Sequence, residues 1–349
     1  MHMADALLAP AVAATMYVAS GTAAGVSIHK LRKDDEPKKL PTMAVTAALV
    51  FAGQMINYTI PGTGSSGHMC GGMLLSALLG PQAGFLSMIV ILAIQCLFFA
   101  DGGLMALGAN VWNMAFYGCF VGYYLIWRPI MRSHWFGEGK GAQRARIIAA
   151  SILGCVITLQ LGAFSVVLET SLSGITELPF GAFVALMQPI HLAIGLVEGL
   201  ITSTVLLFVY ESRPELLQEL EPTGGAEGKR SLKATIAILA VVALVVGGGL
   251  SLLASANPDG LEWALFGNAD AGYSENMGLD EDNFGLQSSA ADTAAGIQEK
   301  TSFLPDYAFA DNDTPVGTTV SGIVGSAMVA GVAILICLAG GFFRKKKHS

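Results

Sequence analysis

The feature that most constrains this chain is the repetition of apolar stretches long enough to cross a lipid bilayer. The hydrocarbon core of a bilayer is about 30 Å thick, so a helix of about 20 apolar residues spans it. Such stretches occur at 5–28, 41–60, 85–100, 109–127, 147–168, 183–210, 234–254 and 318–343. Hydrophobic residues make up 53% of the chain and charged residues 13%, which excludes an ordinary soluble protein. We therefore predict an all-α polytopic membrane bundle.

A shorter apolar run, 69–79, decides the predicted topology. Lys and Arg near the ends of spans stay on the cytoplasmic side of a membrane. The basic residues cluster at 30–39, 128–146, 213–233 and 344–347. If 69–79 crosses, about nine transmembrane helices with the N-terminus outside and the C-terminus cytoplasmic place 18 of the 19 basic residues inside, leaving Lys300 outside. We predict that this run is a short or partly inserted helix that turns at Gly80 and Pro81.

The first apolar stretch has two interpretations, a cleaved signal peptide or a retained helix. A signal peptide carries basic residues before its apolar core, and none occurs here before Lys30. We expect a retained helix with Met1 outside the cell.

Composition divides the chain into three parts. We predict a seven-helix membrane component at 1–212, a cytoplasmic linker at 213–233 and a two-helix companion domain at 234–349. The companion contains a polar segment, 255–317, with twelve acidic residues and Lys300 as its one basic residue. We expect this segment to be extracytoplasmic, solvated and partly disordered, and the alternative is a mouth that attracts cations.

The first two residues carry the chemistry that stands out most. The amine of Met1, the amide nitrogen between Met1 and His2, and the His2 imidazole close one five-membered and one six-membered chelate ring on a single ion. Nitrogen ligands in a square-planar array favour Ni(II) or Cu(II), and imidazole also suits Co(II). His68 ends a glycine-rich loop on the same predicted face and can supply a fourth nitrogen. The alternatives are a flexible terminal histidine at His2 and a helix-capping histidine at His68.

Ionisable residues inside a membrane are costly and deserve separate consideration. His191 and Glu198 are seven residues apart and share one helix face. We favour a buried pair that holds helices together over a role in supporting the metal site or coupling. Asn110 is expected to donate hydrogen bonds between helices. The five cysteines lack C-x-x-C spacing, so we expect apolar fillers and no permanently bound cofactor.

Five stretches together are similar to the CbiM/NikM family, the nickel/cobalt substrate-binding components of energy-coupling factor transporters. They are Met1-His2-Met3-Ala4-Asp5; Ser66 to Gly72 with Leu79-Gly80-Pro81; Leu107 to Asn110 leading to Asn113-Met114-Ala115; His191 to Gly199; and Pro258-Asp259-Gly260-Leu261-Glu262. The last resembles the small companion subunit, fused here to the main component. Ala4 and Ala6 depart from the usual M-H-I-P-D-G start, which affects the shape of the first turn.

This resemblance implies ligands and partners. It implies that Met1, His2 and His68 bind the ion, and we expect Asp5, within the similar start, to support the site or the fold. No G-x-x-x-x-G-K-[ST] loop for ATP phosphates and no H-E-x-x-H zinc motif occurs, so we expect no enzyme activity. The resemblance implies a separate transmembrane coupling (T) component and cytoplasmic ATPase subunits. Besides these and the lipid bilayer, we expect no nucleic-acid partner.

The sequence therefore predicts high-affinity binding and import of Ni²⁺ or Co²⁺ across the cytoplasmic membrane. The alternatives are a self-sufficient secondary carrier or channel, in which His191 and Glu198 relay ions or protons, and a membrane-bound metalloenzyme or sensor. The residues leave the choice between nickel and cobalt open.

Overall fold

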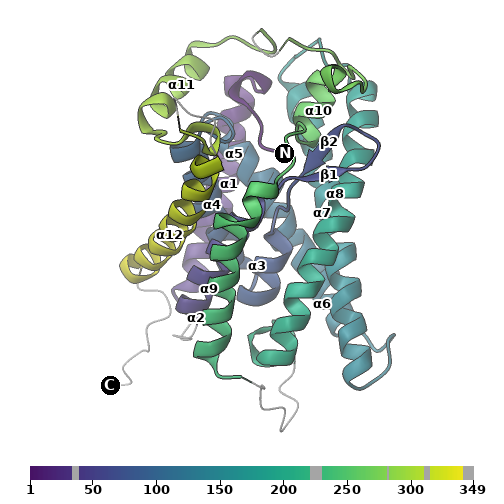
Figure 1. Ribbon diagram of the computed structural model, residues 1–349, viewed down its shortest axis with the longest axis vertical. Helices are drawn as coiled ribbons and strands as arrows, with labels where there is room; N and C mark the ends of the chain where they lie inside the picture. Colours follow the sequence, from purple (N-terminus) through teal and green to yellow (C-terminus); the bar gives the residue numbers. More distant parts are fainter. Residues whose placement is uncertain (34–38, 221–229, 281–282, 310–314, 341–349) are drawn as a thin grey trace.

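The computed structural model describes residues 1–33, 39–220, 230–280, 283–309 and 315–340, which form an elongated helical bundle (Figure 1). Among these residues, five helices are long and apolar enough to cross a membrane. They are α1 (Pro10–Leu31), α4 (Pro81–Phe99), α7 (Lys140–Leu172), α8 (Phe180–Ser212) and most of α12 (Pro315–Gly340). The predicted count of nine crossings and the predicted orientation stay predictions.

Shorter helices complete the bundle. α2 (Lys39–Gln54) and α9 (Leu232–Gly248) are apolar, and α5 (Leu107–Asn110), η2 (Val111–Trp127) and α6 (Arg128–Met131) follow one another as one helical run. Large apolar side chains such as Val18 and Leu125, each 70% exposed, cover the outside of the bundle. Apolar surface of this kind suits a lipid environment.

The short run before Gly80 is the predicted short helix. α3 (Gly72–Leu79) has eight residues, all buried. Gly80 has φ +83°, which suits glycine, and Pro81 begins α4, so the predicted turn is confirmed. Main-chain hydrogen bonds hold both sides of α3: the Ser66 amide donates to the Pro258 carbonyl, and the Gln218 amide donates to the Ala77 carbonyl, each at 2.8 Å.

The second apolar stretch was predicted to remain helical to residue 60, and this is wrong. α2 ends at Gln54, and β1 (Tyr58–Ile60) pairs with β2 (Ser65–Gly67) in an antiparallel hairpin. The β-branched Thr59 and Ile60 favour a strand, and the turn of Pro61-Gly62 that follows breaks any helix. The fold is thus a helical bundle with one small hairpin rather than purely α.

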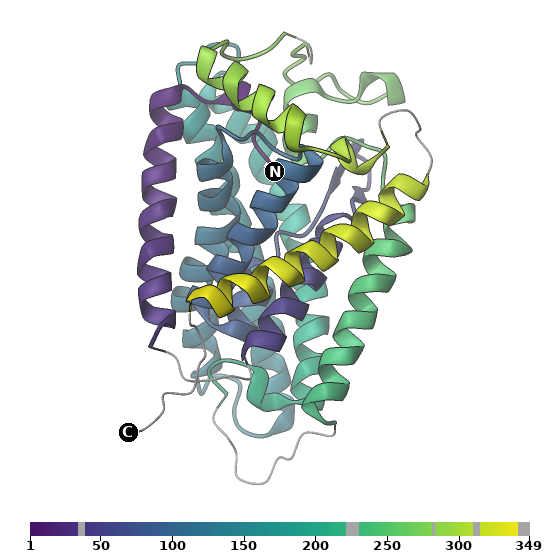
Figure 2. The same cartoon turned by 90° about the vertical axis from the view of Figure 1, so that its left-hand side faces the viewer.

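The two companion helices pack directly on the first part of the chain. α9 and α12 contact each other and α2, and α12 also contacts α4 (Figure 2). The backbones of Gly247 and Gly322 touch at the α9–α12 crossing, which a side chain at either position would prevent. Part of the predicted linker, 221–229, and the predicted basic C-terminal cluster, 344–347, lie outside the described residues.

The described part of the acidic segment contains folded elements, and the predicted partial disorder stays a prediction. The folded elements include α10 (Gly260–Phe266) and α11 (Ser289–Thr301), whose N-termini are capped by the side chains of Asp259 and Ser288. Short 3₁₀ turns, η5 (Ala269–Ala271) and η6 (Pro305–Tyr307), join them to the rest. Leu261, Leu265 and Leu304 are buried, which offsets the cost of ordering the segment. In Figures 1 and 2 these elements cover the end of the bundle that holds the N-terminus.

Candidate functional site

The first nine residues fold into this covered end instead of starting the first helix. α1 begins at Pro10 rather than at the predicted Asp5, because proline is favoured at the first helical position and the residues before it are held elsewhere. Asp5 begins the 3₁₀ turn η1 (Asp5–Leu7), and its carboxylate accepts a hydrogen bond from the Ala106 amide at 2.9 Å. Asp5 therefore anchors the N-terminal segment.

Asn110 holds the same segment from the other side. Its Oδ1 accepts from the Met3 amide at 2.7 Å, and its Nδ2 donates to the Met3 carbonyl at 3.2 Å. The Gly103 amide donates to the same carbonyl at 2.9 Å. Because Met3 is completely buried, these bonds replace the hydrogen bonds to water that its main chain loses on folding. Asn110 was predicted to donate hydrogen bonds between helices, and in the structure it bonds to the N-terminal segment.

The amine of Met1 pairs with a carboxylate from the companion part of the chain. Met1 N lies 2.5 Å from Asp259 Oδ2, although 258 residues separate them. Burial disfavours the charged amine, but the Asp259 carboxylate outweighs it and raises the pKa of the Met1 amine. The same pairing holds the pKa of Asp259 well below its usual range against the opposing effect of burial. Before an ion arrives, Met1 is therefore a buried ammonium with one counterion.

The rings of His2 and His68 lie beside this pair. They stack with centroids 5.4 Å apart and an angle of 18° between their planes. His68 Nδ1 donates to the Met69 carbonyl at 3.1 Å, which leaves Nε2, 3.9 Å from Asp259 Oδ2, as the free nitrogen. Burial and the positive Met1 amine lower the pKa of His68 to about 4. His68 is thus neutral at pH 7, the form that binds metals.

His2 has a second acidic neighbour. Its Nδ1 is 3.0 Å from Asp101 Oδ1, and Asp101 Oδ2 accepts from the Tyr307 hydroxyl at 2.5 Å. Although burial opposes it, the His2 ring holds the pKa of Asp101 well below its usual range. The nitrogen that the predicted six-membered chelate ring uses, Nδ1, is therefore engaged here. An incoming ion has to displace Asp101 from His2 and Asp259 from Met1.

The structure brings the three predicted ligand residues, Met1, His2 and His68, together at one buried place. Within the described ranges, no group of three or more His, Cys, Asp or Glu side chains is arranged to hold a metal ion. A metal site at this place consequently needs main-chain nitrogens, as the chelate does. Whether these residues bind the ion stays a prediction.

Sequence reasoning missed both carboxylates. Asp101 precedes Gly102 and Gly103 and reads as a turn residue. Asp259 was quoted only within the stretch that resembles the companion subunit, and that stretch was the one available signal. In the structure its Oδ1 caps α10 by accepting from the Leu261 and Glu262 amides, which leaves Oδ2 for Met1. The Asp259 charge, together with burial, raises the pKa of Glu262 to about 7.

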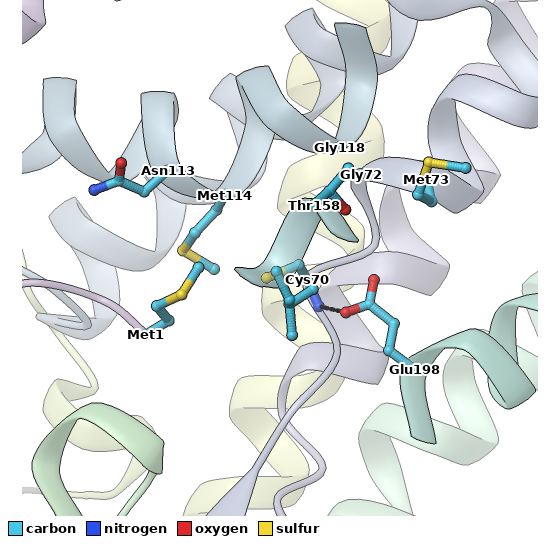
Figure 3. Close-up of a pocket in the computed structure, with 10 residues that line it drawn as sticks. Met1, Cys70, Gly72, Met73, Asn113, Met114, Gly118, Thr158 and Glu198 are labelled. Atoms are coloured by element: carbon cyan, nitrogen blue, oxygen red, sulfur yellow. Dashed lines mark hydrogen bonds between the residues drawn. The ribbon is translucent and has the colours of Figure 1, made fainter. Parts of the chain in front are cut away.

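His191 and Glu198 are both buried, as predicted for residues that hold helices together, and each bonds to a different main-chain partner. The Glu198 carboxylate accepts from the Cys70 and Gly71 amides at 2.8 and 2.9 Å, and so ties α8 to the turn that precedes α3 (Figure 3). His191 Nδ1 donates to the Met187 carbonyl at 2.8 Å. No hydrogen bond joins the two side chains in the part of the chain that the structure describes. Two helical turns separate them along α8, which explains the different partners.

Two small cavities lie next to the site. The first is lined by Met1, His68, His191 and Asp259, with Cys70 and Leu159. The second, shown in Figure 3, shares Met1, Cys70 and Leu159 with the first and adds the sulfur atoms of Met73 and Met114 and the Glu198 carboxylate. The Met1 end of the chain therefore borders on both spaces.

Comparison with known proteins places this arrangement in a family. Residues 2–216 match the cobalt uptake substrate-specific transmembrane region, CbiM, and residues 233–340 match the PDGLE domain. A protein of Archaeoglobus fulgidus, named as a fused nickel transport protein of the NikMN type, is 36% identical over 94% of this chain and 95% of its own. The fused nickel transport protein NikMN of Rhodobacter capsulatus is 31% identical, with 96% of each chain covered.

A solved structure agrees with the sequence matches. The crystal structure of a truncated transition metal transporter has a TM-score of 0.52 and 30% identity, and it covers 60% of this chain and 99% of its own. The predicted family and the predicted multi-pass membrane location are confirmed by these matches. The relatives carry the names of metal transport proteins rather than enzymes. The chain belongs to the CbiM family of nickel and cobalt transport proteins and carries a fused PDGLE domain.

Proposed function

We propose that this chain captures Ni²⁺ or Co²⁺ with high affinity on the outer side of the cytoplasmic membrane for import. The ligands are the Met1 amine, the amide nitrogen between Met1 and His2, the His2 imidazole and His68 Nε2. The observation that carries the proposal is the meeting of the Met1 amine with two stacked imidazoles at one buried place. Asn110 and Asp5 support it, because they hold the segment before α1 in position.

The companion domain takes part in loading. Asp259 neutralises the Met1 ammonium while the site is empty, and the cargo replaces that proton when it binds the amine. Asp101 and Asp259 then remain beside the dication as two negative charges. A buried charge without a counterion is unfavourable by several kcal/mol. The carboxylates therefore stabilise the Met1 ammonium in the empty site and the dication in the loaded site.

The energy for import comes from a separate transmembrane coupling component and cytoplasmic ATPases, as in energy-coupling factor transporters. The absence of an ATP-binding phosphate loop from the sequence supports this. The proposed orientation has support too: the helix ends that carry Lys30, Lys140 and Lys233 point away from the Met1 end (Figures 1 and 2).

The test of the site is titration of the purified full chain with an untagged N-terminus. We expect one Ni²⁺ or Co²⁺ to bind, and we expect a variant with two residues added before Met1 to bind more than about 100-fold more weakly, because the amine and His2 are displaced together. The matched control carries the same two residues at the C-terminus. If the N-terminally extended protein binds the ion as tightly as the parent protein, the proposed chelate is wrong.

The dependence on partners needs a different measurement. We expect cells that produce this chain without any ATPase subunit to accumulate no extra metal. Accumulation under these conditions would favour a self-sufficient carrier.

A further inference from the structure

His191 is a buried histidine that uses one of its two ring nitrogens in a hydrogen bond. The residue is 1% exposed, and its Nδ1 donates to the Met187 carbonyl one helical turn earlier at 2.8 Å. Its Nε2 is buried and has no hydrogen-bond partner among the residues that the structure describes. Because Nδ1 carries the proton, Nε2 presents a lone pair. An unpaired buried acceptor is unfavourable, so a ligand that this nitrogen binds is the natural explanation.

The free nitrogen lies at the proposed metal site. His191 lines one cavity together with Met1, His68 and Asp259. A Cβ atom at Gly260, the residue after Asp259, would lie 3.1 Å from Cε1 of His191. Cε1 lies between the two ring nitrogens, so this side of the ring faces the Asp259 turn, which also holds the Met1 amine. Because Nδ1 is bonded to Met187, Nε2 is the nitrogen left for a ligand.

The hydrogen bonding of His191 repeats that of His68. Nδ1 of His68 donates to the Met69 carbonyl, and Nδ1 of His191 donates to the Met187 carbonyl. In both rings Nε2 is left to bind a ligand. Histidines that bind metals almost always donate their second nitrogen in this way, which fixes the tautomer and the ring. Glu198, two turns further along α8, differs because its two carboxylate oxygens are occupied by main-chain amides.

We propose that His191 Nε2 is an additional ligand, above or below the plane of the four nitrogens, which the site uses for Co²⁺. This inference rests on the proposed function of the site. Four planar nitrogens satisfy Ni²⁺ in its square-planar form. Co²⁺ favours five or six ligands, so a fixed imidazole next to the plane stabilises bound cobalt and adds little for planar nickel. His191 thereby allows one site to accept both ions.

The experiment compares Co²⁺ and Ni²⁺ binding by the full chain with a free N-terminus and by three variants. His191→Ala removes the ligand, and His191→Gln keeps the size of the side chain in case the cavity destabilises the fold. Gln188→Ala is the matched control, because Gln188 lies on the same helix, bonds to Gln160 across to α7 and does not line the cavity. The visible spectrum of bound Co²⁺ reports its ligand number.

We expect both His191 variants to bind Co²⁺ about tenfold or more weakly and Ni²⁺ within about twofold of the parent, with a changed Co²⁺ spectrum. Gln188→Ala leaves both affinities and the spectrum unchanged. An unaltered Co²⁺ spectrum and affinity, or an equal loss for both ions, overturns the role of His191. If the parent protein binds neither ion, the chelate itself is wrong, and this inference fails with it.

Discussion

The two ends of the bundle use charged residues in opposite ways. At the Met1 end the ion pairs are buried: the side chains of Met1 and Asp259 are 3% and 14% exposed. At the other end Arg132 pairs with Glu219 at 2.6 Å and Arg144 pairs with Glu211 at 2.5 Å, and these arginines are 58% and 54% exposed. Exposed pairs of this kind contribute little to stability, whereas a buried charge depends on its partner.

This difference indicates which charged residues serve a function in addition to stabilising the fold. A buried ion pair is weak evidence for stability, since a well-packed apolar pair is often as good. The Met1 end nevertheless places two carboxylates, two imidazoles and an amine in a space closed by the companion segment. The opposite end needs its charges only for solvation and for holding the helix ends together.

Removing the counterion of Met1 is expected to have the largest effect. Asp259→Ala leaves a buried ammonium without a partner, which destabilises the ion-free protein by about 3–5 kcal/mol. Glu262→Gln is the matched control, because it changes the neighbouring carboxyl of the α10 cap without touching Met1. Thermal unfolding of the ion-free protein in detergent measures both. Equal midpoints for the two variants contradict a special role of Asp259.

The pH dependence of ion binding comes next in size. The pKa of the Met1 amine is raised, despite burial, by Asp259, so the amine holds its proton at neutral pH and must release it to the ion. The amide nitrogen between Met1 and His2 must also lose its proton to bind the ion, so two protons leave. Binding therefore weakens by about 100-fold for each unit that the pH falls between pH 8 and pH 5. His68, whose pKa burial lowers to about 4, adds no competition in this range. Calorimetry across these pH values checks the slope, and a flat affinity refutes the proton exchange.

Loosening the N-terminal segment is expected to have a smaller effect. Asn110→Ala leaves the buried main chain of Met3 without two of its hydrogen bonds, at a cost of about 1–3 kcal/mol. The ordered position of Met1 and His2 is lost, so Ni²⁺ affinity falls about tenfold. Asn110→Asp keeps the acceptor for the Met3 amide, so its Ni²⁺ affinity should lie between those of the parent protein and Asn110→Ala. The idea fails if Asn110→Ala binds Ni²⁺ like the parent protein.

The sequence predicted the helical bundle well because each span is a long apolar run, and length alone identifies such a run in lipid. Met1 and His2 were predicted as ligands because chelate chemistry depends on neighbours in sequence, whereas His68 came from the predicted topology of its loop and from the family resemblance. The end of α2 at Gln54 was missed, since apolar residues 58–60 suit a helix and a buried strand equally well. Hydrophobicity could not distinguish them.

The two carboxylates of the site were beyond sequence reasoning for a different reason. Asp101 and Asp259 approach the N-terminus only after the loop behind α4 and the acidic segment have folded over it. Nothing in the spacing of residues separated by 258 positions indicates that contact. The acidic segment itself looked solvated because its charge dominates its composition, while the few leucines that bury it are sparse.

The smallest effect is expected at the opposite end, and it completes the comparison. Arg132→Ala removes a pair with Glu219, but Glu219 still accepts from the Tyr123 hydroxyl at 2.7 Å and lies near Arg128. Because Arg132 is 58% exposed, water replaces the lost contact, and we expect a change below about 1 kcal/mol that shrinks further in salt. Ni²⁺ affinity should not change. Unfolding midpoints at low and high salt measure this, and a loss as large as that of Asp259→Ala would mean that the two ends do not differ as their burial indicates.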